Sequence, residues 1–186
     1  ERVKYPERLL YTFHVGEPIQ YLERALEWKD PQGNLIPYIA LGGMVGKSES
    51  IRRSFLDNCF DVIRRSSNPN VKVHAFGMTT FKLLSNYPIT SADSTAWIMT
   101  GANGGIMTDV GVITVSEQQS NQSSHYSHLP KHLQKAFEES IKEFGFTLEK
   151  LSTCRDSRII HNARYMMKRA KNIDNNRGVK IRRALF

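Results

Sequence analysis

The sequence predicts an α/β protein whose parallel strands are followed by a helical, strongly basic C-terminal region. Short apolar runs alternate with helical patterns through the first half of the chain, with joins of about two to six residues. Strands that are separated by helices in this way pair in parallel through crossovers. The last 36 residues hold 10 Lys and Arg against 2 Asp and Glu, so the whole net charge of +8 lies there.

The first elements each carry a local signal. The apolar run Leu9–Val15 predicts a strand, and Glu17–Trp28 predicts a helix because its apolar residues recur every three or four positions. Ile36–Gly43 predicts a second strand that runs into glycines. Lys47–Ser66 then predicts a helix with Ser48 as its N-cap.

A third strand, a short helix and a fourth strand follow, and the fourth strand ends in an acid. The strand is expected over Val71–Met78 and the helix over Thr79–Tyr87, capped by Thr79 or Thr80. The fourth strand is expected over Ile89–Asp93, and a glycine-rich loop lies beyond it.

The pattern changes after Thr108. Asp109–Glu117 predicts one more strand, the polar segment 118–128 predicts a mobile linker, and helices are expected over Pro130–Phe144 and Ser152–Asn172. The expected organisation is therefore β/α units over residues 1–116, a polar linker over 117–129 and a helical basic region over 130–186.

Composition narrows the class of protein. With 40% hydrophobic residues, no run near the roughly 18 apolar residues of a membrane helix and no signal peptide, the chain is expected to be globular, cytoplasmic and not bound to a membrane. Cys59 and Cys154 lie far apart without a metal-binding motif, so no disulfide framework or zinc site is expected. Because the chain begins with Glu1 rather than methionine, we expect an excerpt or a cleavage product.

Polar or glycine-rich segments follow all four expected strands. Ligands of parallel α/β folds bind where the carboxyl ends of the strands meet, so these segments are expected to converge. They are His14–Glu17, Gly42–Gly46, His74–Gly77 and Asp93–Trp97.

Two glycines and two histidines are candidates within these segments. Gly42 and Gly43 either bring bare backbone close to a flat ligand or make a tight turn. Their spacing to Ser48 is not that of a phosphate-binding loop. His14 and His74 each end a strand, and each is either a satisfied structural group or a contact to a ligand.

Asp93 is the candidate for chemistry. An ionised carboxylate that hydroxyl and backbone N–H groups hold beside an aromatic side chain suits nucleophilic attack on a sugar carbon. The competing interpretation is that Asp93 is only the N-cap of the next helix.

The basic C-terminal region is a candidate nucleic-acid interface, because Lys and Arg side chains neutralise phosphates. The other interpretation is a solvated helix face. The candidate residues are Arg164, Lys168, Arg169, Lys171, Arg182 and Arg183.

Taken in order, the strand ends resemble the second half of the tRNA-guanine transglycosylase barrel. The stretch YIALGGMVGKSES is similar to that family's strand that ends in Ile-Gly-Gly. The stretch VKVHAFGMTTFKLLSNYPITSADSTAW is similar to the next unit, whose strand ends at the nucleophilic aspartate, here Asp93. The second stretch most resembles the phage and bacterial branch thought to insert 7-deazaguanines into DNA. The similarity spans roughly Tyr11 to Thr108.

The resemblance implies the C-terminal half of a (β/α)8 TIM-type barrel and a base-exchange reaction. Asp93 would attack C1′ of a guanine nucleotide, release guanine and hold the sugar until a 7-deazaguanine replaces it. The substrate-binding residues that it implies are Gly42 and Gly43 at the base edge, His14 in the region of a base-reading glutamine, and Met78 or Trp97 beside the ring.

The resemblance also implies partners. The nucleic acid would be DNA or tRNA, in the host cytoplasm if the protein is viral, and a missing N-terminal half or a second chain would complete the barrel beside Leu9–Val15. No cofactor is expected and, because the family's zinc ligands have no counterpart here, no metal. Two other functions stay open: a non-catalytic nucleic-acid-binding subunit, and an unrelated barrel enzyme with Glu17 as its second acid.

Overall fold

The computed structural model describes residues 9–78 and 80–184, with side chains described as far as Ile173. The chain divides into two compact units between Ser94 and Thr95, and each unit has its own apolar core. Among the described helices, none is both long enough and apolar enough to cross a membrane.

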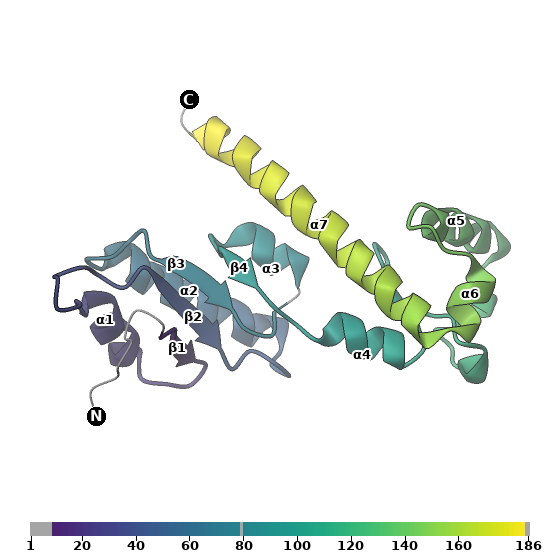
Figure 1. Ribbon diagram of the computed structural model, residues 1–186, viewed down its shortest axis with the longest axis horizontal. Coiled ribbons are helices and arrows are strands. Elements are labelled where there is room, and N and C mark those ends of the chain that lie inside the picture. The colour runs from purple at the N-terminus through teal and green to yellow at the C-terminus, as the bar shows by residue number, and fades with distance from the viewer. Residues whose placement is uncertain (1–8, 79, 185–186) are drawn as a thin grey trace. The chain divides into compact units, whose positions relative to one another are not determined.

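The first unit alternates strands and helices, as the sequence predicts. Four strands pair in parallel in the order β1-β2-β3-β4 (Figure 1): β1 (Tyr11–His14), β2 (Tyr38–Gly42), β3 (Lys72–Ala75) and β4 (Ser91–Ala92). The helices between them are α1 (Ile19–Glu27), α2 (Glu49–Arg65) and α3 (Phe81–Asn86). The described residues form an open parallel sheet and no closed barrel, so the α/β prediction is confirmed in this coarser form.

Of two predicted helix N-caps, one caps its helix through its side chain and the other does not. Ser48 caps α2 as expected, because its side chain accepts a hydrogen bond from the Ile51 N–H at 3.3 Å. Thr80 is the N-cap residue of α3, but its side chain does not cap the helix. The Thr80 hydroxyl instead accepts a hydrogen bond from Arg52 Nη1 at 2.9 Å, which ties α3 to α2.

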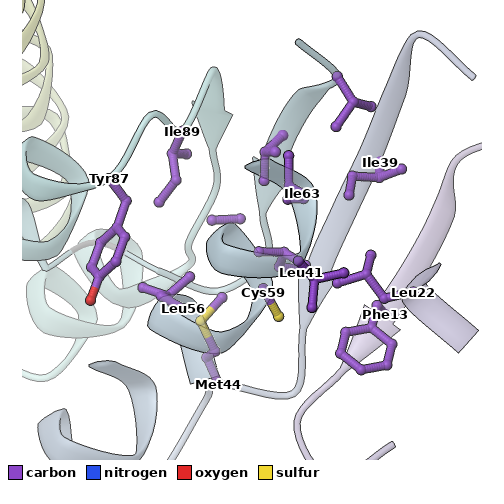
Figure 2. Close-up of a cluster of buried hydrophobic side chains, with 14 of the residues drawn as sticks. Phe13, Leu22, Ile39, Leu41, Met44, Leu56, Cys59, Ile63, Tyr87 and Ile89 are labelled. Carbon is purple, nitrogen blue, oxygen red and sulfur yellow. The ribbon is translucent and has the colours of Figure 1, made fainter. Parts of the chain in front are cut away.

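One face of the sheet is apolar and packs against the helices. The strand register places Phe13 beside Leu41 on this face, and Leu56 and Cys59 from α2 pack in the same cluster (Figure 2). Burial raises the pKa of the Cys59 thiol to about 12, so this cysteine is a protonated core residue.

The opposite face of the sheet carries small or polar side chains. Successive side chains of a strand point to opposite faces, so the register aligns Thr12, Ala40, His74 and Ser91 in one row away from the core. Parallel sheets in proteins usually have both faces covered. The core cluster of the first unit covers the apolar face, on the other side from this row.

The second unit is mainly helical and contains one β-hairpin. Its elements are α4 (Ala96–Ala102), β5 (Gly105–Thr108), β6 (Gly111–Thr114), the 3-10 helices η2 (Glu117–Gln119) and η3 (Tyr126–His128), α5 (Lys131–Lys142), α6 (Leu148–Thr153) and α7 (Arg155–Ala184). Strands β5 and β6 are antiparallel, and Ile106 and Ile113 pack with Phe137 and Leu151 in the core of this unit. The predicted strand after Thr108 is therefore one arm of a hairpin.

The expected mobile linker has defined contacts. The Thr114 N–H donates to the Ser124 carbonyl at 3.0 Å, and the His125 side chain is buried. The hairpin and α4 also pack against α7, so the compact units divide after Ser94, earlier than the boundary expected after residue 116. A linker pattern of Ser, Gln and Asn did not reveal these contacts, because they depend on backbone and hydroxyl groups of Thr114, which lies outside the polar segment.

The predicted helix over Ser152–Asn172 is two helices. The Thr147 hydroxyl caps α6 by accepting a hydrogen bond from the Lys150 N–H, and Cys154 adopts an extended backbone between α6 and α7. Cys154 therefore lies outside α7, and the expected single helix over Ser152–Asn172 is interrupted at this residue.

Candidate active site

Asp93 follows β4 at the carboxyl end of the sheet. Its N–H donates to the Ala75 carbonyl at 3.3 Å, which continues the pairing with β3. Its Oδ1 accepts a hydrogen bond from the Gly77 N–H at 2.9 Å, and the side chain is 59% exposed. The N-cap residue of α4 is Thr95, so the carboxylate is held by the loop after β3 and is not the helix cap.

Gly77 is required for this contact. Its φ of 65° lies in the left-handed region that glycine adopts without strain, and a Cβ at this position would lie 2.3 Å from Val45 Cγ2. A side chain at residue 77 would strain the backbone at this φ and would require the exposed Val45 side chain to move, and the strain would disturb the N–H that holds Asp93.

A row of polar side chains lies behind Asp93 on the polar face of the sheet. The Tyr38 hydroxyl is 2.5 Å from Ser91 Oγ, and Ser91 Oγ is 2.6 Å from His74 Nδ1. His74 Nε2 lies 3.6 Å from Asp93 Oδ1. Three parallel strands contribute these side chains, which links His74 to the candidate nucleophile.

The apolar surface beside Asp93 differs from the expected one. Met78, expected beside the ring of the base, is fully buried in the core of the first unit. Phe76 and Val45 are exposed instead, and the Phe76 ring meets the His74 ring edge-on with 4.5 Å between centroids. Sequence analysis missed Phe76, although its place directly after β3 was a usable signal.

The glycines after β2 differ in accessibility. Gly42 is buried, its carbonyl accepts a hydrogen bond from the Val15 N–H at 3.1 Å, and a Cβ there would lie 2.9 Å from His14 Cδ2. Gly43 is exposed with φ of 74°. The backbone of Gly43 is therefore the more accessible of the two to a flat ligand.

His14 and Glu17 form a local pair at the end of β1. The His14 N–H donates to Glu17 Oε2 at 2.8 Å, and the His14 imidazole Nδ1 lies 3.7 Å from the same oxygen. The His14 side chain is 51% exposed, so it is accessible at the strand ends.

The position of Glu17 argues against a second acid beside Asp93. β1 and β4 are the two edges of the sheet, three strand spacings apart, which is about 14 Å along the sheet. The carboxyl pairs of glycosidases lie only about 5–9.5 Å apart. Glu17 also turns back onto its own loop, so it does not form such a pair.

Trp97 belongs to the second unit. It is half-buried in the first turn of α4, and its carbonyl accepts a hydrogen bond from Asn162 Nδ2 at 3.1 Å. This contact joins two residues of the second unit, to which Trp97 belongs.

Three of the candidate basic residues already have partners within the second unit. Arg164 Nη1 donates to the Phe144 carbonyl at 2.6 Å, Lys168 pairs with Glu143 at 2.8 Å and Arg169 pairs with Asp109 at 3.0 Å. The Lys171 side chain is exposed, and those of Arg182 and Arg183 lie outside the described residues. The carboxylates of Glu143 and Asp109 offset the charges of Lys168 and Arg169, whereas the Phe144 carbonyl leaves the charge of Arg164 in place.

A groove of about 1070 Å³ lies at the other end of the sheet, beside the start of β3 and the residues before β4. Tyr87 and Asp57 line it, and the Tyr87 hydroxyl donates to Asp57 Oδ1 at 2.6 Å. The pKa of Tyr87 is raised to about 12, mainly by burial and secondly by the nearby Asp57 carboxylate. The phenol therefore stays protonated, and this groove is separate from the strand-end residues.

Among the side chains that the structure describes, within residues 9–78 and 80–173, no group of three or more His, Cys, Asp and Glu could hold a metal ion. No protein-family model matches the chain, and no curated protein or solved structure matches it either.

Proposed function

We propose that the chain is the C-terminal, catalytic half of a guanine transglycosylase that replaces guanine in DNA or tRNA with a 7-deazaguanine. The observation that carries the proposal is the Asp93 carboxylate, which is exposed at the end of a parallel strand and held through Oδ1 by the Gly77 N–H. The order of the strand ends in the sequence supports the choice of reaction.

The proposed reaction has two displacements at C1′ of the nucleotide. Oδ2 of Asp93 attacks C1′ while the bond from C1′ to guanine N9 breaks, and the leaving guanine takes up a proton. The incoming 7-deazaguanine gives up the proton of its N9 nitrogen, bonds to C1′ and releases the carboxylate. One proton is taken up and one is given up, so the exchange needs no oxidant or reductant.

The flat base would lie on the strand ends beside Asp93. Gly43, at the end of β2, offers exposed backbone for the base edge, and His14, at the end of the more distant strand β1, offers an exposed imidazole only to the far side of the base. The exposed ring of Phe76 is the better candidate to flank the base, since Met78 is buried. Double-stranded substrate would require the target nucleotide to flip out of the helix.

The open sheet supports a role for a further half-barrel. A closed eight-stranded barrel has twice the four parallel strands of the first unit, and the small, polar face of the sheet corresponds to a barrel interior. We propose that a second chain, or a preceding segment of the same protein, covers this face and pairs with β1.

The test is formation of a covalent adduct between the chain and nucleic acid. An affinity-tagged copy, purified with the chains that accompany it, is incubated with a guanine-containing oligonucleotide and 7-deazaguanine, and mass spectrometry locates the adduct. Adduct on Asp93 and incorporation of labelled guanine support the proposal. Full exchange activity in Asp93→Asn contradicts it.

Asp61→Asn is the matched control. Asp61 lies near the end of α2, and its carboxylate pairs with Arg64 and Arg65 on the same helix. This substitution removes one surface carboxylate of the same unit without changing the strand ends, so it should leave adduct formation unchanged.

The second candidate function is a nucleic-acid-binding subunit without chemistry, favoured by the basic C-terminal region. It predicts salt-sensitive binding that Asp93→Asn does not change and that Lys171→Gln weakens. Removing residues 164–186 is a poor test, because Tyr165 is buried in the second unit.

A further inference from the structure

His74 is enclosed by the sheet and still faces the exposed carboxylate of Asp93. Its side chain is 16% exposed, whereas that of Asp93 is 59% exposed. The ring lies on β3 between β2 and β4, and the Phe76 ring packs edge-on against it. The imidazole is therefore held in one orientation, with Nδ1 toward Ser91 and Nε2 toward Asp93.

The hydrogen-bond partners favour one tautomer of His74. If the Ser91 hydroxyl donates to Nδ1, the imidazole proton is on Nε2 and points at Asp93 Oδ1. The Tyr38 hydroxyl then donates to Ser91 Oγ, so all three donors point toward the carboxylate. The opposite tautomer would turn the Nε2 lone pair toward a carboxylate oxygen, which is unfavourable.

We propose that His74 is a positioning residue for Asp93, kept in its Nε2–H tautomer by Ser91 and Tyr38. The catalytic meaning of this inference rests on the proposed function, in which Asp93 is the nucleophile. The separation of 3.6 Å is longer than a hydrogen bond, as catalytic contacts commonly are before substrate binds. The proposal predicts that this separation shortens when substrate binds.

In this proposal the two carboxylate oxygens of Asp93 have different roles. Within the described part of the chain, the Gly77 N–H and the His74 imidazole both face Oδ1. Two donors on one oxygen fix the plane of the carboxylate and leave Oδ2 for attack on C1′. The same donors stabilise the charge that returns to Asp93 when the second displacement releases the sugar.

Two substitutions of His74 separate its two nitrogens. The amide of Gln reaches the position of Nε2, so His74→Gln keeps a donor toward Asp93, whereas the amide of Asn reaches only the position of Nδ1. We expect His74→Asn to slow adduct formation about 100-fold, the cost of a misplaced reacting group, and His74→Gln to slow it about tenfold or less. Nucleic-acid affinity should not change in either variant.

Ser91→Ala and Tyr38→Phe test the support behind the ring. Each removes one hydroxyl, and the loss should shrink with distance from Asp93, so Ser91→Ala should slow adduct formation more than Tyr38→Phe. His132→Asn and His132→Gln are the controls, because His132 is exposed on α5 of the second unit, and both should react at the wild-type rate.

A measurement that does not depend on activity is side-chain ¹⁵N NMR of the histidine-labelled full chain. The His74 signals should report the Nε2–H tautomer. Asp93→Asn should shift the Nε2 signal, and Ser91→Ala should shift the Nδ1 signal.

These results separate the inference from the proposed function. An Nδ1–H tautomer, no response to Asp93→Asn, or equal losses in His74→Asn and His74→Gln would overturn the role of His74, even if adduct forms on Asp93. The expected NMR response with no adduct in the wild-type protein would instead overturn the transglycosylase function and leave the contact between His74 and Asp93 intact.

Discussion

The two units use polar side chains in opposite ways. In the first unit, Asp93 and His14 lie at the exposed ends of strands, and their side chains are more than half exposed. In the second unit, Arg158 and Asn162 are buried, with 6% and 0% of their surface exposed. The comparison separates polar groups that are held for contact with a ligand from polar groups that hold the fold.

The buried groups of the second unit use their hydrogen bonds internally. Asn162 Oδ1 accepts from the Met107 N–H at 2.8 Å, and its Nδ2 donates to the carbonyls of Trp97 and Gly105 at 3.1 and 3.3 Å. Arg158 donates to the Gly101 carbonyl at 2.9 Å. These bonds connect α4, the hairpin and α7, so they are expected to matter for stability.

Functional groups of this chain are therefore expected among the polar side chains that face solvent. A buried polar side chain such as Asn162, which bonds to backbone groups of its own unit, is explained by its role in the fold. The Asp93 carboxylate has one oxygen fixed by the Gly77 N–H while most of its side chain faces solvent, which structure alone does not require.

The largest expected effect is a loss of adduct formation with almost no change in the free energy of unfolding. Asp93→Asn keeps an oxygen that accepts the Gly77 N–H and removes the nucleophile, so adduct formation should fall about a thousandfold or more. The free energy of unfolding should change by less than about 0.5 kcal/mol because the residue is exposed. Parallel adduct and urea-denaturation assays check both, and a large loss of stability would remove the contrast between the units.

Asn162→Ala should have the reverse effect. It leaves one buried N–H and two carbonyls without their partner, so the second unit should lose about 3 kcal/mol of stability. Urea denaturation followed by Trp97 fluorescence in a Trp28→Phe background measures it. Asn172→Ala, at an exposed position of the same helix, is the control, and equal effects of the two substitutions would contradict the structural role of Asn162.

Gly77→Ala should affect both properties. Gly77 and Gly46 both have positive φ, at 65° and 75°, but a Cβ would clash with Val45 only at Gly77. Gly46→Ala should cost about 1 kcal/mol, whereas Gly77→Ala should cost about 2–3 kcal/mol and also slow adduct formation. Thermal unfolding and the adduct assay measure the pair, and equal losses would show that the contact with Val45 is unimportant.

The smallest expected effect is on pH dependence. Burial lowers the pKa of His161, so the unfolded chain binds this proton at a higher pH than the folded chain does. Stability from the neutral imidazole is present above about pH 6.5 and is lost as the pH falls from there toward the folded pKa. Denaturation at pH 7.5 and 5.5 should show a smaller difference in His161→Gln.

The exposed His132 provides the control for this measurement. His132→Gln should keep the pH dependence of the wild-type protein. If it removes as much of the difference as His161→Gln does, the effect does not come from the buried imidazole.

Local patterns predicted much of the first unit. Periodicity indicated the four strands and three helices, and the Ser48 cap followed from the residue before a helical pattern. The row of Tyr38, Ser91 and His74 could not be predicted, because Tyr38 and Ser91 are 53 residues apart and meet only through the order and register of the strands.

The second unit was harder to predict. Asn162 and Arg158 look like surface residues of a basic helix in the sequence, yet both are buried and bond to carbonyls 57 residues earlier in the chain. The sequence signal for a charged helix face is the same whether the charges meet water or backbone carbonyls.

The length of β4 has a consequence for how this chain can evolve. Ser91 and Asp93 are two residues apart, so the alternation of the strand directs both toward the side of His74. Inserting one residue between them would turn the carboxylate to the other side without altering any core residue. The placement of the acid therefore depends on the number of residues between Ser91 and Asp93 rather than on which residue lies between them. Insertions or deletions in this two-residue strand should be selected against more strongly than substitutions of Ala92.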